Sequence, residues 1–203
     1  MKTDKTTSWD DRYSQEAYVY GEEANVFLQE KISLLETIDD VLCIAEGEGR
    51  NAVFLAEANK TVTAWDYSNE GLKKARKLAE KKQVTIKTEQ VDLAHVEWEA
   101  NQWDAVVNIH GHFNPQDRQR ILQGVQRTIK LQGYYISEVY STDQLRFKTG
   151  GPKNIAMLYD PIELLELFKG WRIIHFFVGE TVRNEGAMHH GAGHVIQMIF
   201  QKI

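Results

Sequence analysis

The chain has 203 residues, of which 42% are hydrophobic and 26% are charged, so it is long enough to form one α/β domain with a core. Its formal net charge is −5, and its densest basic run, residues 73–77, is interleaved with apolar residues as on the solvated face of a helix, which disfavours a nucleic-acid substrate. The single cysteine, Cys43, excludes an internal disulfide. The polar N-terminus and the lack of an apolar run of about 20 residues favour a cytoplasmic protein without a membrane partner.

Strand-like and helix-like segments alternate along most of the chain. The expected strands are short apolar or β-branched runs at residues 41–45, 61–65, 85–91, 103–109 and 134–140. The expected helices cover residues 22–36, residues 51–58, a segment capped by Ser68 or Asn69, and a segment that begins at Asn114 and Pro115. This alternation predicts βα units around a mostly parallel sheet.

The last part of the chain has a different pattern. Residues 160–163 (DPIE) have the form of a capping box and predict a short helix. Residues 171–182 and 195–203 are strand-like and are joined by a polar, Gly- and His-rich segment, which predicts an antiparallel hairpin. We therefore expect an α/β fold with a Rossmann-like, doubly wound, seven-stranded sheet, mostly parallel with a C-terminal antiparallel hairpin, in a single domain over residues 1–203.

A glycine loop follows the first expected strand. Gly47 and Gly49 permit a tight turn and a close approach of the backbone to a ligand. With Ala52 the loop also satisfies the relaxed dinucleotide pattern G-x-G-x-x-A, and Asp66 stands at a suitable distance along the chain for ribose hydroxyls. A nicotinamide cofactor is therefore one alternative.

The charge of this loop favours another cofactor. Glu46 and Glu48 flank Gly47 at the start of a helix, where a dinucleotide would place its pyrophosphate. One like-charge pair at about 4 Å costs on the order of 4 kcal/mol before screening. The sulfonium and ammonium groups of S-adenosylmethionine would instead be complemented by these carboxylates.

The ends of the next strands offer further contacts, because open α/β sheets bind ligands at the carboxyl ends of their strands. We expect Asp66 to accept the ribose hydroxyls and Tyr67 to cover the adenine, while Asp92 and the amide of Leu93 bind the adenine edge. Asn108 and His110 end the fourth strand, where the methionine part and the methyl group should lie.

These residues carry a resemblance to a known family. The sequence resembles class I S-adenosylmethionine-dependent methyltransferases, and within them the small bacterial enzymes similar to the tellurite-resistance methyltransferase. The matching segments are residues 9–13 (WDDRY), 20–28 (YGEEANVFL), 45–56 (AEGEGRNAVFLA), 62–68 (VTAWDYS), 71–75, 92–93, 103–104, 150–153 (GGPK) and 189–191 (HHG). Where the superfamily often has Asp in its first strand and Gly before the loop, this chain has Cys43 and Ala45.

The resemblance implies an N-terminal lid over residues 1–36 and a cofactor-binding core over residues 37–203. Trp9, Tyr13, Tyr18 and Tyr20 agree with this, because aromatic side chains can close a site and exclude water. An ordinary helix packed against the sheet is the alternative for this segment. The expected cofactor-binding residues are Tyr20, Glu46, Gly47, Glu48, Gly49, Asn51, Asp66, Tyr67, Ser68, Asp92, Leu93, Asn108 and His110.

The methyl acceptor is less well defined by the sequence. His110 is the first choice for a base or substrate-orienting residue, and Glu138 and Tyr140 are second choices. A thiolate, selenide or telluride needs no base, whereas a hydroxyl or a protonated amine does. We expect a small-molecule acceptor, a thiol or chalcogen species by resemblance, and a monomer or homodimer. The alternatives are a cofactor-binding protein without turnover and a nicotinamide-dependent oxidoreductase.

Three histidines near the C-terminus raise the question of a metal site. His190 and His194 are four residues apart, but Gly191 and Gly193 disfavour a helix that would bring them together. The H-H-x-x-x-H spacing of His189, His190 and His194 lacks the helical pairing with a carboxylate that is expected for zinc. We therefore expect no metal.

Overall fold

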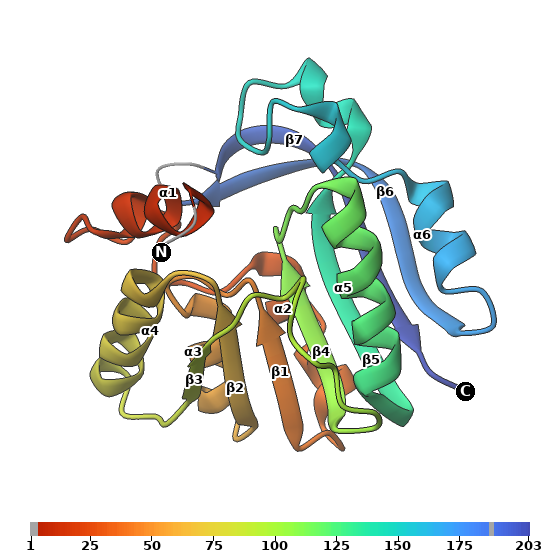
Figure 1. The fold of residues 1–203 in the computed structure, drawn as a ribbon, viewed down its shortest axis with the longest axis horizontal. Coiled ribbons are helices and arrows are strands. Elements are labelled where there is room, and N and C mark those ends of the chain that lie inside the picture. Colours follow the sequence, from red (N-terminus) through yellow and green to blue (C-terminus); the bar gives the residue numbers. More distant parts are fainter. Residues whose placement is uncertain (1–3, 187–188) are drawn as a thin grey trace.

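The computed structural model describes residues 4–186 and 189–203. These residues form a seven-stranded sheet in the order β3-β2-β1-β4-β5-β7-β6 (Figure 1). The strands are β1 (Asp40–Ile44), β2 (Thr61–Asp66), β3 (Lys87–Gln90), β4 (Trp103–Ile109), β5 (Ile129–Tyr140), β6 (Arg172–Glu185) and β7 (His189–Gln201). The first five pair in parallel, and β7 pairs antiparallel with both β5 and β6. The predicted fold class is confirmed.

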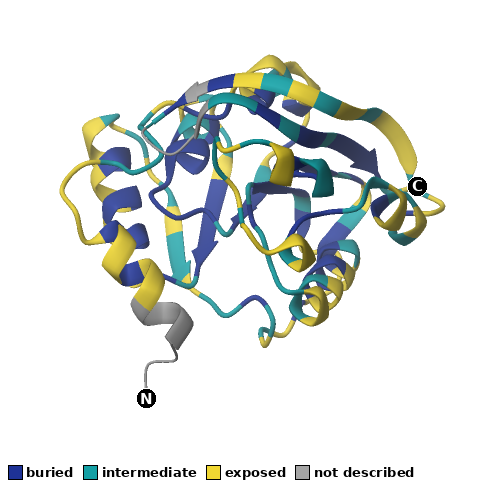
Figure 2. Cartoon of the chain, turned by 90° about the horizontal axis from the view of Figure 1, so that it is seen from above, coloured by how far each residue is buried: buried dark blue, intermediate teal, exposed yellow. Residues whose placement is uncertain are grey.

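Helices cover both faces of this sheet. One face carries α2 (Val26–Glu30), the 3-10 helix η1 (Ile32–Leu35) and α3 (Arg50–Glu57), and α4 (Asn69–Lys81) packs beside α3. The other face carries α5 (Pro115–Thr128) and α6 (Pro161–Leu167). Viewed from above, buried residues follow the inner strands, whereas exposed residues lie on the outer sides of the helices and along the edge strand β6 (Figure 2). Among the residues that the structure describes, no helix is long and apolar enough to cross a membrane.

Local signals in the sequence set the starts of three helices. The side chain of Ser68 accepts a hydrogen bond from the backbone N–H of Gly71 at the start of α4. Asn114 accepts in the same way from Asp117 in α5, and Asp160 accepts from Ile162 and Glu163 in α6. Each side chain satisfies an N–H group that has no partner within the first turn of its helix. These three predicted helix starts are confirmed.

The predicted helix over residues 22–36 is wrong in its extent. The structure has only α2 and η1 there, and residues 22–25 are not helical. The physical reason is tertiary, because the backbone N–H of Asn25 donates to the side chain of Asn51 and its own side chain caps α2. The third strand also differs, since β3 has four residues in place of the predicted 85–91.

The C-terminal hairpin is longer than the sequence predicts. The polar segment that was expected to be a loop between residues 182 and 195 belongs mostly to strands, with pairing from Arg172↔Gln201 to Glu185↔His189. Backbone pairing with the neighbouring strand therefore outweighs the weak strand propensity of Gly191 and Gly193. The far ends of β6 and β7 reach over the upper edge of the sheet toward the N-terminal helix α1 (Asp4–Tyr13) (Figure 1).

Candidate functional site

The glycine loop turns the chain from β1 into α3. Gly47 and Gly49 have φ angles of 61° and 90°, in the left-handed region that glycine adopts at low cost. Gly49 also lies so close to α4 that a Cβ atom there would stand 2.5 Å from the Cβ of Ala75. Ala45, which replaces the glycine common in related enzymes, has a φ of 51°. The loop thus needs glycine at both predicted positions.

Glu46 occupies the N-terminus of α3. Its Oε1 accepts hydrogen bonds from the backbone N–H groups of Asn51 and Ala52, at 2.9 and 2.8 Å. These are groups of the kind on which a dinucleotide would lay its pyrophosphate. A buried carboxylate already fills that position, so this loop is unsuited to a nicotinamide dinucleotide. Burial raises the pKa of Glu46 to about 7, although the two backbone donors and Arg50 oppose the rise.

Asp66 ends β2 beside the same loop. Its two carboxylate oxygens accept from the backbone N–H groups of Gly47 and Ser68, each at 2.7 Å. Burial raises its pKa to about 6, against the effect of these donors. A carboxylate has about four acceptor positions, so these backbone donors do not exhaust its capacity to bind a ligand. Hydroxyl donors and cationic groups would stabilise this pair of buried acids, so the donor set fits S-adenosylmethionine.

Glu48 contacts the N-terminal segment. Its Oε2 accepts from the backbone N–H groups of Val19 and Tyr20, at 2.8 and 3.3 Å, and its Oε1 lies 2.5 Å from the Nζ of Lys74. Lys74 is buried, which corrects the interpretation of residues 73–77 as a wholly solvated face. A cofactor contact by Glu48 stays a prediction, and the structure adds a lysine partner that the sequence did not indicate.

The N-terminal helix α1 packs against α4 near the glycine loop. Asp10 accepts from the hydroxyl of Ser68 at 2.6 Å and from the backbone N–H of Glu70 at 3.2 Å. Tyr13 is buried, and its hydroxyl would stand 2.7 Å from a Cβ atom at Gly47. The segment thus lies against the predicted cofactor loop, although neither Asp10 nor Tyr13 was among the expected site residues. Tyr20 was among the expected site residues, and its hydroxyl accepts a hydrogen bond from Arg12 at 3.0 Å.

The expected adenine contacts lie at the ends of β2 and β3. Asp92 accepts from the backbone N–H of Ala94 and lies 3.0 Å from His95, and its side chain is 41% exposed. Tyr67 is half-buried, whereas Leu93 is buried and its carbonyl accepts from the indole of Trp98. A half-buried carboxylate after β3 and a half-buried aromatic ring after β2 are compatible with the predicted contacts to adenine.

Asn108 has a different environment from the one expected. It is fully buried, its Oδ1 accepts from the backbone N–H of Gly111, and its Nδ2 donates to the hydroxyl of Tyr135. These contacts fix the turn after β4, in which His110 has a φ of 57°. A direct cofactor contact by the Asn108 side chain stays a prediction.

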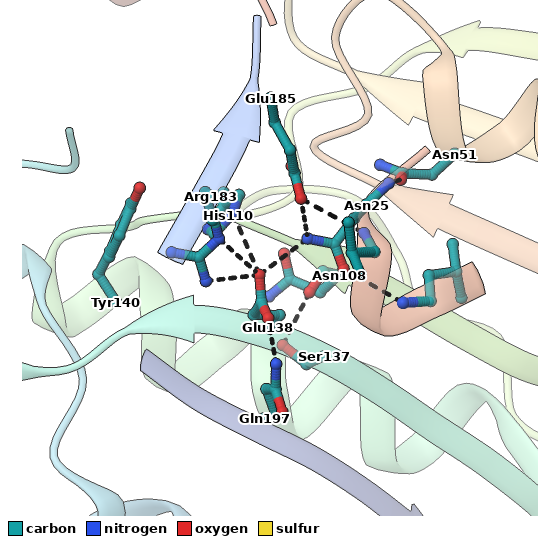
Figure 3. Close-up of polar contacts among 12 residues, drawn as sticks. Asn25, Asn51, Asn108, His110, Ser137, Glu138, Tyr140, Arg183, Glu185 and Gln197 are labelled. Atoms are coloured by element: carbon teal, nitrogen blue, oxygen red, sulfur yellow. Dashed lines mark hydrogen bonds and ion pairs between the residues drawn. The ribbon is translucent and has the colours of Figure 1, made fainter. Parts of the chain in front are cut away.

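The three predicted catalytic residues lie together at the ends of β4 and β5 (Figure 3). The Nε2 of His110 lies 3.4 Å from the Oε1 of Glu138, and the rings of His110 and Tyr140 stack with centroids 4.8 Å apart. Burial raises the pKa of Tyr140 to about 12, so its hydroxyl keeps its proton at neutral pH and does not act as a base.

Glu138 is the centre of a buried polar cluster that the sequence did not reveal. Its Oε1 accepts from Arg183 Nε and Nη2, at 3.1 and 2.7 Å, and from Asn25 Nδ2 at 2.8 Å, while its Oε2 accepts from Gln197 at 2.6 Å. Glu185 extends the cluster, because it accepts from Asn25 and forms an ion pair of 2.7 Å with Arg50. The members come from five separate parts of the chain, so spacing along the sequence could not identify the cluster. Asn25 and Arg50 had a signal as parts of the quoted segments 20–28 and 45–56, and Glu138 was a second choice as a catalytic residue.

Other histidines near this end have structural contacts. His112 lies 3.0 Å from the carbonyl of Met157 through Nδ1, and burial lowers its pKa to about 4, so it is neutral at pH 7. His194 lies on β7, 2.7 Å from the hydroxyl of Ser141. The side chains of His189 and His190 lie outside the described residues. Among the residues that are described, no cluster of three potential metal ligands occurs.

Comparisons with known proteins agree with this geometry. Residues 41–133 match the family model described as a methyltransferase domain. The matched residues carry a methyltransferase domain, and they support the predicted enzyme class with S-adenosylmethionine as the methyl donor. Among curated protein sequences, none matches it.

Several solved structures share the fold. TehB from Haemophilus influenzae is 18% identical, with 98% of this chain and 67% of that chain covered and a TM-score of 0.71. The N-methyltransferase NodS from Bradyrhizobium japonicum, solved with S-adenosylhomocysteine, is 11% identical over 98% of this chain and 99% of that chain, with a TM-score of 0.73. A structure solved for the conversion of a disulfide bond into a thioacetal group during echinomycin biosynthesis is 19% identical over 98% and 92%, with a TM-score of 0.74. At these identities the likeness shows the fold alone.

Proposed function

We propose that this methyltransferase acts on a small acceptor, a thiol or chalcogen species, at the carboxyl ends of β4 and β5. The observation that carries the proposal is the enclosure of this end of the sheet. Asn25, Glu138 and Arg183, from the N-terminal segment, the sheet and the hairpin, are each buried, and both Asn25 and Arg183 donate to Glu138. An acceptor bound among these groups must be small, which argues against a nucleic acid or a folded protein.

The residues of the chain have separable tasks in this proposal. Glu46, Gly47 and Asp66 hold the cofactor at the glycine loop, while Tyr67, Asp92 and Leu93 contact its adenine. S-adenosylmethionine supplies an activated methyl group, whose bond to the sulfonium breaks with both electrons kept by that sulfur while the acceptor atom forms the new bond.

His110 is the proposed base for a protic acceptor. It receives the acceptor's proton, and Glu138 at 3.4 Å orients its ring and stabilises the imidazolium. The hydroxyl of Tyr140 donates a hydrogen bond and does not act as a base, because its pKa is raised. A thiol is deprotonated in this way, whereas a selenide or telluride arrives as an anion.

Two structural neighbours support the chemical class of the acceptor. TehB is a tellurite-resistance methyltransferase, and the echinomycin structure concerns sulfur chemistry on a small molecule. We further propose that residues 1–36 form a lid on a core of residues 37–203 within a single domain. The location is proposed to be cytoplasmic and the assembly a monomer or homodimer.

An acceptor screen tests the proposal. Purified protein is incubated with S-adenosylmethionine and, separately, with tellurite and selenite under reducing conditions, small thiols, small amines and RNA, and the formation of S-adenosylhomocysteine is measured. We expect a thiol or a reduced chalcogen to accelerate the formation of S-adenosylhomocysteine. In the variant His110→Gln, this acceleration should fall strongly for a thiol and much less for a chalcogenide. Acceleration only by RNA or by amines would overturn the acceptor class. Cofactor binding without acceleration by any acceptor would favour the alternative of a binding protein without turnover.

A further inference from the structure

Asn25 connects parts of the site that are distant in sequence. It lies just before α2, is 1% exposed, and has no role in the function proposed above beyond enclosing this end of the sheet. Its backbone N–H donates to Oδ1 of Asn51, in the first turn of α3 next to the glycine loop. Its side chain points the other way, toward the carboxylates of β5 and β6 (Figure 3). One residue thus contacts both the cofactor end and the acceptor end.

The chemistry of the neighbours fixes the orientation of the Asn25 side chain. Its Nδ2 donates to Glu138 at 2.8 Å and to Glu185 at 3.1 Å, and its Oδ1 accepts from the backbone N–H of Leu28 at 3.2 Å. A flipped amide would place its oxygen against two carboxylates and its nitrogen against an N–H group. Both protons of the amide nitrogen therefore serve carboxylates, and the amide bridges two negative groups that would otherwise repel one another.

The bridge bears on His110 through Glu138. The same oxygen of Glu138, Oε1, accepts from Asn25 and lies 3.4 Å from the Nε2 of His110. Oε1 also accepts from Arg183, and Oε2 accepts from Gln197. Movement of the carboxylate in any direction breaks one of these contacts, so its position next to His110 depends on the complete set.

We propose that Asn25 is a positioning residue of methyl transfer, which holds Glu138 against His110 when the N-terminal segment is docked. This inference rests on the proposed role of His110 as the base. Its consequence is that removal of the Asn25 side chain impairs the acceptor step and spares cofactor binding. The contact to Asn51 comes from the backbone of Asn25, and it survives any substitution other than proline.

The test uses the full-length protein with Asn25→Asp, which keeps the shape and replaces the donor by a carboxylate. The charged groups that face this position are Glu138 and Glu185 directly, and Arg50, Arg183 and His110 through those carboxylates. A new carboxylate between two others takes up a proton readily, and its protonated form donates again. We therefore expect turnover of the best thiol acceptor to fall at least tenfold at pH 8 and to recover part of that loss at pH 6, relative to wild type at the same pH.

Asn114→Asp is a matched control. Asn114 also caps a helix, and its Nδ2 also donates to a carboxylate, that of Asp117, but this contact lies outside the cluster. We expect the control to keep turnover and its pH profile. Cofactor affinity measured by calorimetry should stay within threefold of wild type in both variants. If Asn25→Asp does not fold, Asn25→Ser retains a cap for α2 and loses the bridging amide, and it should show the same loss of turnover without recovery at low pH.

A second readout separates failure of this inference from failure of the proposed function. Nitrogen-15 spectra of the histidine rings, with the His110 signal assigned from His110→Gln, require no acceptor. The His110 signal should move in Asn25→Asp and stay in place in Asn114→Asp. An unchanged His110 signal, or an equal loss of turnover in both variants at every pH, would overturn the role of Asn25. A moved signal in a protein that turns over no acceptor would support the contact while the proposed function fails.

Discussion

Glu46 and Asp66 are buried acids at the glycine loop, and if they bind the cofactor as proposed, their environments make that binding depend on pH. Burial raises the pKa of Glu46 to about 7, with a contribution from the negative charge of Asp66, and burial raises the pKa of Asp66 to about 6. Without ligand, both groups are largely protonated at pH 5.5 and ionised at pH 8. A cationic ligand with hydroxyl donors favours the ionised forms and therefore binds with release of protons.

The affinity for S-adenosylmethionine should consequently rise between pH 5.5 and pH 8. Glu46→Gln should flatten the upper part of this profile, because the remaining acid has a pKa of about 6. Calorimetric titrations at four pH values measure both effects. An affinity that falls as the pH rises would contradict the assignment of these acids to the cofactor.

Asp66 is the acid for which we expect the largest single effect on binding. Asp66→Asn should weaken binding of S-adenosylmethionine by about 1.5–3 kcal/mol, or about 10- to 150-fold, because a charge-assisted hydrogen bond to the ligand is lost. Asp104→Asn is the matched control. Asp104 likewise accepts from two backbone N–H groups, those of Asp39 and Asp40, but it lies at the amino end of β4, away from the glycine loop. A similar loss of affinity in both variants would indicate a general structural effect and remove Asp66 from the site.

At the scale of single residues, helix caps could be predicted from the sequence, whereas contacts between distant residues could not. Ser68, Asn114 and Asp160 could be identified as caps because each bonds to a backbone group two or three residues ahead. The partners of Glu48 and Glu138 could not, since Lys74 is 26 residues from Glu48 and Arg183 is 45 residues from Glu138. A pattern within one segment contains no information about such partners.

At the scale of elements, the N-terminal segment is attached to the core by carboxylates. Asp10 bonds to Ser68, and Glu48 bonds to the backbone of Val19 and Tyr20. The charged helix α1 has few apolar residues to bury, so these polar contacts contribute much of its attachment. Such a segment can dock and undock with a smaller change in free energy than a helix with a wide apolar face.

Deletion of residues 1–21 should therefore weaken cofactor binding at least tenfold while the sheet stays folded. Calorimetry measures the affinity, and circular dichroism with thermal unfolding checks the core. A chain that lacks only residues 1–3 is the control and should bind as the full chain does. An unchanged affinity after the larger deletion would contradict a lid and favour an ordinary packed helix.

The strands and helices were predictable where the pattern is local. The fourth strand agrees at both ends with the prediction of residues 103–109, because its apolar run is buried on both faces. The hairpin was predicted too short because Gly191, Gly193 and His194 are poor strand formers, and only their pairing with residues 180–183 of β6 holds them extended. The break in the predicted helix 22–36 likewise arises from the distant partners of Asn25.

At the scale of the whole molecule, a buried ion pair joins two segments that are far apart in the sequence. Arg50 at the start of α3 and Glu185 at the end of β6 form an ion pair whose side chains are 7% and 6% exposed. A buried pair adds little net stability over apolar residues of the same volume, but the loss of one partner leaves an uncompensated charge.

Arg50→Met should accordingly lower the free energy of unfolding by about 3–5 kcal/mol. The double variant Arg50→Met with Glu185→Leu should recover part of that loss. Lys87→Met, which removes an exposed ion pair with Glu89, should cost less than about 1 kcal/mol. Urea denaturation measures all three, and a double variant as unstable as the single one would contradict the explanation by an unpaired charge.

The cluster around Glu138 has a consequence for the order in which the protein is made. Asn25 emerges from the ribosome more than a hundred residues before Glu138 and Glu185, the carboxylates that it bridges. Synthesis proceeds at about 5–20 residues per second, so the N-terminal segment waits many seconds for its partners. During that interval the glycine loop can already fold beside β2, while the N-terminal segment has no hairpin to contact. The cluster around Glu138 is therefore complete only when β7 has followed β6, because β6 joins the sheet through β7 and Gln197 lies on β7.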